Sequence, residues 1–195
     1  MIGDKRGLTL MELLVVLGVF SLTVAMASAI FIQSNRAQRR VLSLTSAQAD
    51  LRFALESIVH EVRGGQIDYA AYASSSGISI PTDRLYVKSA DGDHLEFYAE
   101  TNPTVCPVGV AKCLAVKVGG VPQSVTSTGV LLENLTFYVS PQTDPFLVDE
   151  ATGLYTSDQQ PLVTVAMRIR TGGSKTEDPA ELDAQTTVAS RTYAR

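Results

Sequence analysis

The fold of this chain is decided by residues 8–32, which read LTLMELLVVLGVFSLTVAMASAIFI and follow a short charged leader ending in Arg6-Gly7. The segment is 25 residues long and almost wholly apolar. As an α-helix it would extend about 37 Å, whereas the hydrocarbon core of a bilayer is about 30 Å thick. We therefore expect residues 8–32 to form one membrane-spanning helix with some tilt.

Glu12 is the only charged residue in this apolar segment. A charge inside hydrocarbon costs about 2.5–3.5 kcal/mol on insertion scales, so proteins keep one there when it has a partner or a function. No other residue between 8 and 32 carries a compensating charge. The pattern therefore predicts a functional role for the Glu12 carboxylate that the segment alone does not explain.

These residues resemble the N-terminal signature of the type IV pilin superfamily, which comprises pilins, minor pilins and the pseudopilins of type II secretion. The signature is a basic leader ending in Gly, an apolar residue that becomes the N-methylated terminus, and then Thr-Leu-hydrophobic-Glu-Leu followed by two hydrophobic residues. The stretch from Gly7 to Val15 matches it place for place, with Leu8 where Phe or Met is more usual.

The resemblance implies how the chain is processed and assembled. A prepilin peptidase would cut between Gly7 and Leu8, and removal of the seven-residue leader from the 195-residue chain would leave 188 residues. Glu12 would then neutralise the new α-amino group of a neighbouring pilin or pseudopilin as their helices stagger in a filament. Losing one member of such a buried pair strands the other, at a cost of about 3–5 kcal/mol.

Two other interpretations fit parts of the same segment. An ordinary secretory signal peptide would use Lys5-Arg6 as its basic end and Ala27-Ser28-Ala29 as its cleavage site, but Glu12 lies where such a peptide is purely apolar. A plain single-span anchor explains the length but not the lone carboxylate. Both remain alternatives to the pilin interpretation.

Charge placement predicts orientation less well than the motif does. Two basic residues precede the span and three follow it, namely Lys5, Arg6, Arg36, Arg39 and Arg40. The positive-inside rule alone would therefore favour the opposite orientation to that of a pilin. The leader motif is more specific, and it places the N-terminus in the cytoplasm, the span in the inner membrane and the following domain in the periplasm.

The helix is expected to continue beyond the membrane as an amphipathic segment over residues 33–64. Apolar residues recur at intervals of three and four, with Gln48 as the one polar break, at Val41, Leu44, Leu51, Leu55, Ile58 and Val62. Gly64-Gly65 is a typical helix stop, and no proline interrupts residues 8–64. One helix of about 55 residues is therefore predicted.

The remaining residues, 65–195, are predicted to form one β-rich domain. Residues 85–88 and 95–98 flank Asp91-Gly92, a pair that tolerates the positive φ angles of a hairpin turn. Further strands are expected at residues 114–118, 130–140, 161–170 and 186–193, with 175–183 as a polar excursion. A long helix followed by an antiparallel sheet is an α+β arrangement. It resembles the pilin fold, and residues 51–55, 61–63, 135–139 and 186–191 are similar to minor subunits of the pseudopilin J and minor-pilin W type.

Cys106 and Cys113 are the only cysteines. Two thiols without histidine partners cannot complete a four-ligand zinc site, and their spacing is not that of a Cys-x-x-Cys redox motif. In an extracytoplasmic domain, a disulfide that closes this short loop is the favoured interpretation, and two buried free thiols are the alternative.

The rest of the sequence offers little catalytic chemistry. The net charge of −4 gives no basic field for nucleic acid, and His60-Glu61 lacks the second histidine of a zinc-protease helix. Asp91, Asp93 and His94 could hold calcium or another metal, although a solvated hairpin is favoured. We expect no enzyme, metal or cofactor.

The sequence therefore predicts a structural minor subunit of a type IV pilus or type II secretion pseudopilus. A DNA-uptake machine would use the same subunit architecture. The alternatives are a secreted or membrane-anchored binding module with no filament role, and a membrane-anchored enzyme.

Overall fold

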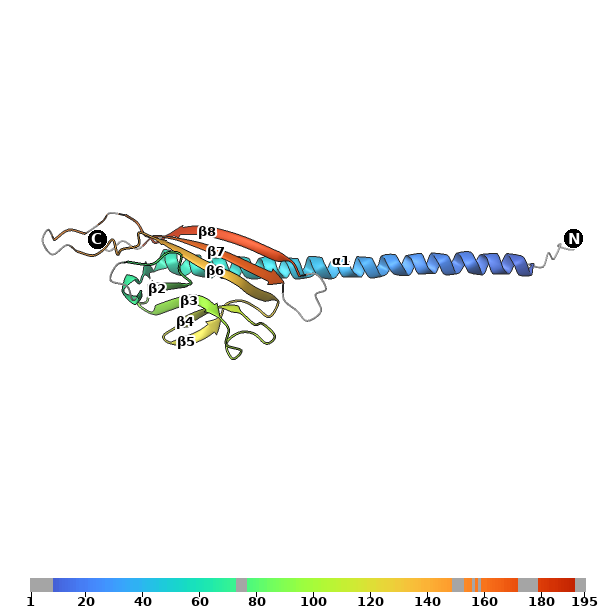
Figure 1. Cartoon of the computed structure of the whole chain (residues 1–195), viewed down its shortest axis with the longest axis horizontal. Helices are drawn as coiled ribbons and strands as arrows, with labels where there is room; N and C mark the ends of the chain where they lie inside the picture. Colours follow the sequence, from blue (N-terminus) through green and yellow to red (C-terminus); the bar gives the residue numbers. More distant parts are fainter. Residues whose placement is uncertain are drawn as a thin grey trace. The chain divides into compact units, whose positions relative to one another are not determined.

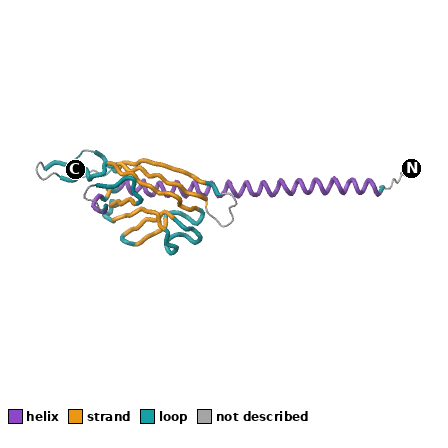
Figure 2. The backbone as a smooth tube through the Cα atoms, in the orientation of Figure 1, coloured by secondary structure: helices purple, strands orange, loops and turns teal. Residues whose placement is uncertain are grey.

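The computed structural model describes residues 9–72, 77–148, 153–155, 157, 159–171 and 179–191. The chain divides into two units, Met1–Leu42 and Ser43–Arg195, and the strands of the described residues belong to the second. A single helix, α1 (Leu10–Gly64), runs from one unit into the other without a break (Figures 1 and 2). It has 55 residues, as the sequence predicted.

The second unit contains two antiparallel sheets. Sheet A has the order β1-β2-β3-β4-β5 and sheet B the order β6-β7-β8. The strands of sheet A are β1 (Gln66–Ile67), β2 (Arg84–Lys88), β3 (His94–Glu100), β4 (Cys113–Val118) and β5 (Val121–Ser124). Those of sheet B are β6 (Val130–Ser140), β7 (Leu162–Thr171) and β8 (Glu181–Ala189). A 3-10 turn, η1 (Tyr69–Ala71), follows β1. The architecture is α+β and pilin-like, which confirms the predicted fold class.

Both sheets share one hydrophobic core with the second half of α1. The buried stripe of the helix consists of Ala47, Leu51, Ala54, Ile58 and Val62. Sheet A contributes Leu85, Val87, Phe97 and Leu114, and sheet B contributes Phe137, Val163, Val165 and Ile169. Fully burying one such Val, Leu, Ile or Phe side chain contributes about 1.5–3 kcal/mol. The helix is therefore an internal element of the domain as well as its N-terminal extension.

The buried stripe differs in part from the predicted one. Leu51, Ile58 and Val62 are buried, but Gln48 is exposed and Leu55 is only half-buried. Ala47 and Ala54 take the intervening places, with exposed fractions of 1% and 0%. Alanine side chains therefore complete the buried stripe at two positions where a pattern of large apolar residues predicts none.

Strand β6 joins the two sheets. Thr82 and Phe137 exchange backbone hydrogen bonds, with N···O distances of 3.0 and 2.8 Å, and the Leu132 N–H donates to the Lys112 carbonyl at 3.0 Å. A register shift between Leu132 and Asn134 interrupts the pairing of β6 with β7. Such a bulge bends a strand, so β6 can pair with β7 and still touch the segments that precede β2 and β4.

The end of β8 closes the domain against the end of α1. The Ser190 hydroxyl donates to the Gly65 carbonyl at 2.8 Å, and the Arg191 N–H donates to the Arg63 carbonyl at 3.3 Å. Carbonyl groups in the last turn of a helix have no partner within the helix. The C-terminal strand therefore supplies hydrogen bonds that the helix end requires, and Ser190 is buried in doing so.

Three sequence predictions for this unit need correction. The short strands β1 and β5 were not predicted. The last strand begins at Glu181, inside the stretch that was expected to be a polar excursion. Leu182 and Ala184 pack against the core, while the alternating residues Glu181, Asp183 and Gln185 face solvent. In the β2–β3 turn only Gly92 has a positive φ, of 92°, and the Gly92 N–H donates to the Ser89 carbonyl at 2.9 Å. Asp91 needs no positive φ in this longer turn.

Gly65 provides a test of how closely the helix end packs. A Cβ atom at this position would lie 2.3 Å from the Lys88 carbonyl oxygen, whereas one at Gly64 would have nothing within 4 Å. Gly65→Ala should therefore lower the free energy of unfolding by about 1–3 kcal/mol, the usual cost of overpacking. Gly64→Ala should leave it unchanged or raise it slightly, because Ala is the better helix former. Urea unfolding of the full chain in detergent measures both. Equal stability of the two variants would contradict this packing.

Candidate functional site

The first turn of α1 is built around Thr9 and Glu12. The Thr9 carbonyl accepts a hydrogen bond from the Leu13 N–H at 3.1 Å, and the Thr9 hydroxyl oxygen accepts one from the Glu12 N–H at 3.3 Å. Thr9 is thus the N-cap of the helix, and Thr-x-x-Glu is the sequence of a capping box. The same residues that resemble a processing motif also fix the start of α1, and the Thr-x-x-Glu spacing is the sequence signal for it.

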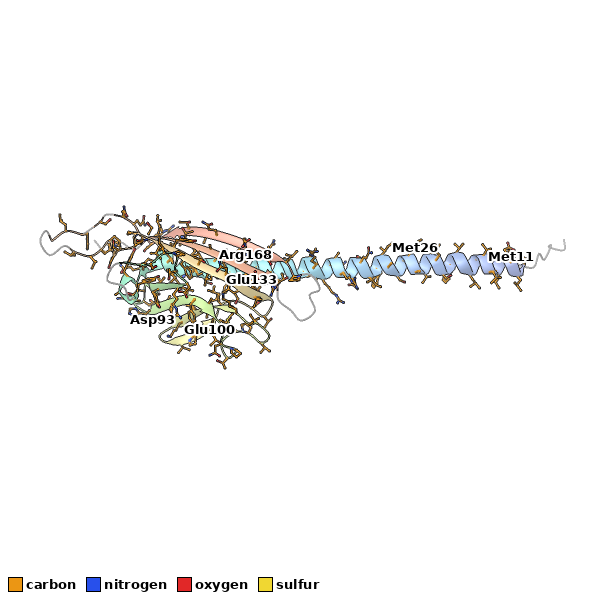
Figure 3. All side chains as sticks on the ribbon, in the orientation of Figure 1. Met11, Met26, Asp93, Glu100, Glu133 and Arg168 are labelled. Atoms are coloured by element: carbon orange, nitrogen blue, oxygen red, sulfur yellow. A yellow bond between two sulfur atoms is a disulfide. The ribbon has the colours of Figure 1, made fainter. Side chains whose placement is uncertain are left out.

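Beyond Glu12, the helix of the first unit exposes apolar side chains on every side. Large hydrophobic residues from Leu10 to Ile32 have exposed fractions between 47% and 78%, and side chains such as Met11 and Met26 project around the whole circumference (Figure 3). A helix that is apolar all round belongs in a lipid or protein environment. This part of α1 is long and apolar enough to cross a membrane.

The hydroxyl groups in this segment are satisfied within the helix. Ser21 donates to the Leu17 carbonyl at 2.7 Å, Thr23 to the Phe20 carbonyl at 2.8 Å, and Ser28 to the Val24 carbonyl at 2.8 Å. A buried polar group costs little once it has a hydrogen-bond partner. Glu12 is therefore the one side chain of residues 9–32 whose burial in hydrocarbon calls for a charge from elsewhere.

Of the residues predicted for processing and assembly, the structure describes only Glu12. Gly7 and Leu8 lie outside the described residues. Glu12 lies in the first turn of α1, where the helix dipole favours a negative charge. The first turn of α1 can thus present one carboxylate near the start of a helical segment that is otherwise apolar as far as Ile32.

Cys106 and Cys113 are joined by a disulfide, with Cα atoms 5.6 Å apart. The bond closes the β3–β4 connection, and the two cysteines form a small buried cluster with Val110, against which Leu131 packs. Val108, at the tip of the same loop, is 92% exposed. The disulfide holds a loop that has little core of its own.

Glu100 organises the start of this loop. Its carboxylate accepts hydrogen bonds from the Asn102 N–H at 2.9 Å, the Tyr98 hydroxyl at 2.8 Å and the Thr101 N–H at 2.8 Å. These bonds, the Asn102 N–H foremost, hold the pKa of Glu100 below its ordinary value because they favour the ionised form. The Glu100 carboxylate thus holds the chain where it leaves β3, and the disulfide holds it again at Cys106, six residues later.

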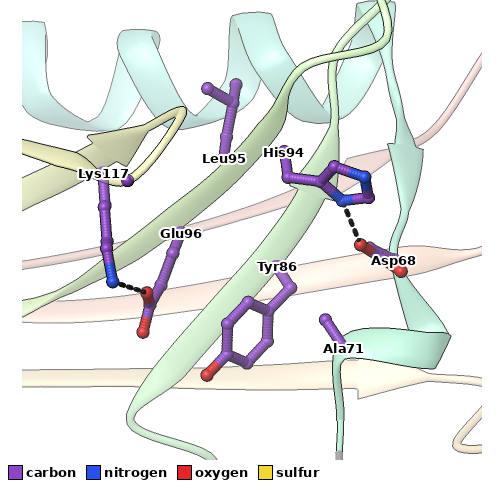
Figure 4. A pocket seen from close by; sticks show the side chains of 8 residues that line it. Asp68, Ala71, Tyr86, His94, Leu95, Glu96 and Lys117 are labelled. Carbon is purple, nitrogen blue, oxygen red and sulfur yellow. Dashed lines mark hydrogen bonds and ion pairs between the residues drawn. The ribbon is translucent and has the colours of Figure 1, made fainter.

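A pocket of about 290 Å³ lies on the face of sheet A (Figure 4). The Tyr86 ring stands between a hydrogen-bonded pair and an ion pair: the His94 Nδ1 atom is 2.7 Å from the Asp68 carboxylate, and the Lys117 Nζ atom is 3.8 Å from that of Glu96. Arg84 also pairs with Glu96. These are cross-strand and strand-to-turn contacts, and Lys117 and Arg84 compensate the Glu96 carboxylate.

Tyr72 extends this hydrogen-bonded surface. Its hydroxyl accepts from the Tyr86 N–H at 3.1 Å and donates to the Arg84 carbonyl at 3.3 Å. Burial, the main cause, raises the pKa of Tyr72 to about 12, so the hydroxyl keeps its proton at neutral pH. The Tyr72 hydroxyl thus bonds to backbone groups of β2 at the positions that lie beyond the end of its partner strand β1.

The candidate metal residues do not form a ligand set. His94 turns to Asp68 rather than to Asp91 and Asp93. Among the described residues no group of three His, Cys, Asp or Glu side chains could hold a metal ion. His60 lies exposed on α1 with its Nδ1 atom 3.4 Å from Glu61, and Glu56 pairs with Arg52 at 2.8 Å.

Comparison with known proteins identifies the N-terminal segment. Residues 3–28 match the prokaryotic N-terminal methylation motif. No curated protein and no solved structure matches the chain. The chain thus carries the prepilin-type signal, which implies processing by prepilin peptidase and assembly with other pilins. Together with the pilin-like architecture it supports a pilin-like subunit that is membrane-anchored before assembly.

The disulfide gives a prediction for the stability of the domain. Replacing both cysteines by serine should lower the free energy of unfolding by about 2–3 kcal/mol, because the unfolded chain regains the entropy of a short open loop. Urea unfolding of the full chain with and without reductant measures this. Reduced wild type should unfold at the same midpoint as the double variant. An oxidised wild type that is no more stable than either would contradict the prediction.

Proposed function

We propose that this protein is a minor pilin or pseudopilin, a structural subunit that assembles through its N-terminal helix into a type IV pilus or a type II secretion pseudopilus. The observation that carries the proposal is the methylation motif at residues 3–28. It is continuous with a helix that is apolar all round as far as Ile32 and that contributes a buried stripe to the domain in the second unit. The function of such a chain is packing rather than catalysis.

The proposed mechanism begins with cleavage between Gly7 and Leu8. Residues 1–7 are the leader, 8–32 the membrane and filament-core helix, 33–64 its amphipathic continuation, and 65–195 the periplasmic domain. Before assembly, the N-terminus is cytoplasmic and the span lies in the inner membrane. After cleavage, the Leu8 ammonium of one subunit and the Glu12 carboxylate of its neighbour satisfy each other inside the apolar bundle.

Two further features support a minor subunit of the pseudopilin J or minor-pilin W type. The domain, residues 65–195 with two sheets, is larger than the lean domain that the resemblance implies for a major subunit. The segments similar to those minor subunits include residues 135–139 of β6 and 186–189 of β8, which are two of the three strands of sheet B. Identification of the subunits that co-purify with the chain from membranes would distinguish a pilus, a secretion machine and a DNA-uptake machine.

The competing function is a secreted or membrane-anchored binding module without a filament role. The exposed apolar helix would then serve only as an anchor or an export signal. N-terminal sequencing of the mature protein separates the possibilities: Leu8 supports the pilin-like subunit, Ile30 a secreted module, and Met1 a plain anchor.

Gly7→Ala tests the processing step. The peptidase must approach the backbone at its cleavage site, where even a methyl group intrudes, so the variant should remain uncut. Intact-mass measurement of membrane-extracted protein gives the result directly. A variant whose leader is removed as completely as that of wild type would overturn the assignment of Gly7.

Glu12→Gln tests the assembly step. The variant should insert into the membrane and be cleaved after Gly7, because it removes the costliest group of the span and leaves the leader intact. Crosslinking in cells to neighbouring pilin-like subunits should fall by at least tenfold, since the partner ammonium would lose its anion.

Glu181→Gln is the matched control, because it makes the same chemical change on an exposed residue at the start of β8. It should crosslink as wild type does. If Glu12→Gln is cleaved, inserted and crosslinked as well as this control, Glu12 is not a docking charge and a plain anchor becomes the better account.

A further inference from the structure

The second unit has an apolar groove of about 520 Å³ beside its buried core. One wall is a face of α1 that includes Phe53, Glu56 and Glu61, and the opposite side includes Val116, Val118 and Val125. These valines are partly buried and pack against the core. Phe53 is 59% exposed although it is aromatic and adjoins the buried Ala54. Four of the five α1 residues in the lining are polar, namely Glu56, Ser57, His60 and Glu61. This surface, called the acidic groove below, thus combines the exposed Phe53 ring and two carboxylates with the valines of the opposite side.

The carboxylates of the acidic groove lie on its α1 wall, which holds Glu56 and Glu61 with His60 between them. Glu56 also pairs with Arg52, which lies outside the groove, at 2.8 Å. Its lining residues, all in the described part of the chain, include no lysine or arginine. Carboxylates beside an apolar floor favour an occupant that combines apolar and basic side chains.

The lining residues of α1 recur with helical spacing, at positions 53, 56, 57, 60 and 61. They form one face more than two turns long, roughly 12 Å at 1.5 Å per residue. An amphipathic helix that lies in such a groove contacts it through residues three and four apart. The geometry therefore fits a helix laid along α1.

The helix α1 of this chain shows that a helix carrying the methylation motif can combine basic and apolar side chains just after its membrane span. Directly after its apolar span, α1 carries Arg36, Arg39 and Arg40 at intervals of three and one, followed by Val41 and Leu42. These two apolar side chains are 61% and 70% exposed. A neighbouring subunit with the same organisation would bring basic and apolar side chains together on one helical stretch.

We propose that the acidic groove binds the corresponding stretch of a neighbouring pilin-like subunit, the basic and apolar turns that follow its membrane span. This inference rests on the proposed function and names the surface that receives the partner. The groove contact would join the domain to a neighbouring subunit, whereas the Glu12 carboxylate would pair with an ammonium group among the apolar helices.

Site-specific photocrosslinking in cells tests the proposal with three probe positions in the full chain. Ser57 lies in the acidic groove, Ala29 on the apolar helix and Tyr138 on the outward face of β6. The Ser57 probe should give an adduct whose peptide maps to the stretch after the membrane span of a motif-bearing subunit, including a second copy of this chain. An adduct with lipid, an unrelated protein or another subunit's β-domain overturns the proposal, and so does the absence of an adduct.

Two variants test the contribution of each side chain. Phe53→Ala should lower the yield of the Ser57 adduct by about tenfold, whereas Tyr138→Ala, the matched loss of an exposed aromatic ring, should not change it. The pair Glu56→Lys and Glu61→Lys should lower it similarly, and Glu181→Lys should not. Intact-mass detection of the Cys106–Cys113 disulfide and unchanged thermal unfolding show that each variant is folded. Unchanged adduct yield in folded groove variants overturns the proposal.

The Ala29 probe separates this inference from the proposed function. Adducts between Ala29 and pilin-like subunits, without an adduct at Ser57, would overturn the groove while the filament role stands. Loss of pilin-like adducts at both positions would overturn the filament role itself.

Discussion

Both sheets of the domain pack on one stripe of α1, and the small side chains of Ala47 and Ala54 set how closely they approach. Larger residues at these positions would push the strands outward and open the core between Leu51 and Ile58. Protein interiors tolerate little such change, because cores are packed as densely as organic crystals. The helix therefore determines the positions of β2, β3 and β4 on sheet A and of the three strands of sheet B.

The C-terminal end of α1 is also tied to the domain, by hydrogen bonds and by close packing. Ser190 and Arg191 donate to carbonyls at the end of α1, and Gly65 lets β2 approach to within contact of the backbone. The first and last elements of the domain are thus joined through backbone carbonyls at the helix end and through the buried Ser190 hydroxyl. The Cys106–Cys113 loop of sheet A is held by a covalent bond, by the Glu100 hydrogen bonds and by the Leu132 N–H bond to the Lys112 carbonyl.

Much of this fold could be predicted from the sequence because its signals are local. The absence of proline and the Gly64-Gly65 stop predict the helix, and alternating apolar residues predict β6 and β7. The alanines of the stripe could not be recognised, since alanine is common on any helical face and only packing distinguishes Ala47 from Ala49. Strand β5 was missed because Pro122 argues against a strand, yet a proline is tolerated on an edge strand such as this one. The acidic groove depends on the approach of β4 and β5 to α1, which no local pattern contains.

The place of Glu12 in the first turn of α1 and its proposed role in docking require different things. At this position of a Thr-x-x-Glu capping box, a side-chain oxygen suffices, and Gln serves as well as Glu. Toward an ammonium group and the positive end of the helix dipole, only the charge matters. Cleavage before Leu8 would place the new ammonium beside that positive end, an unfavourable position in an isolated subunit. Glu12 is the only acidic residue between positions 8 and 49, so in the proposed assembly one carboxylate would compensate both positive charges. In the proposed assembly each subunit contributes one ammonium and one carboxylate, so a stack leaves unmatched groups only at its ends.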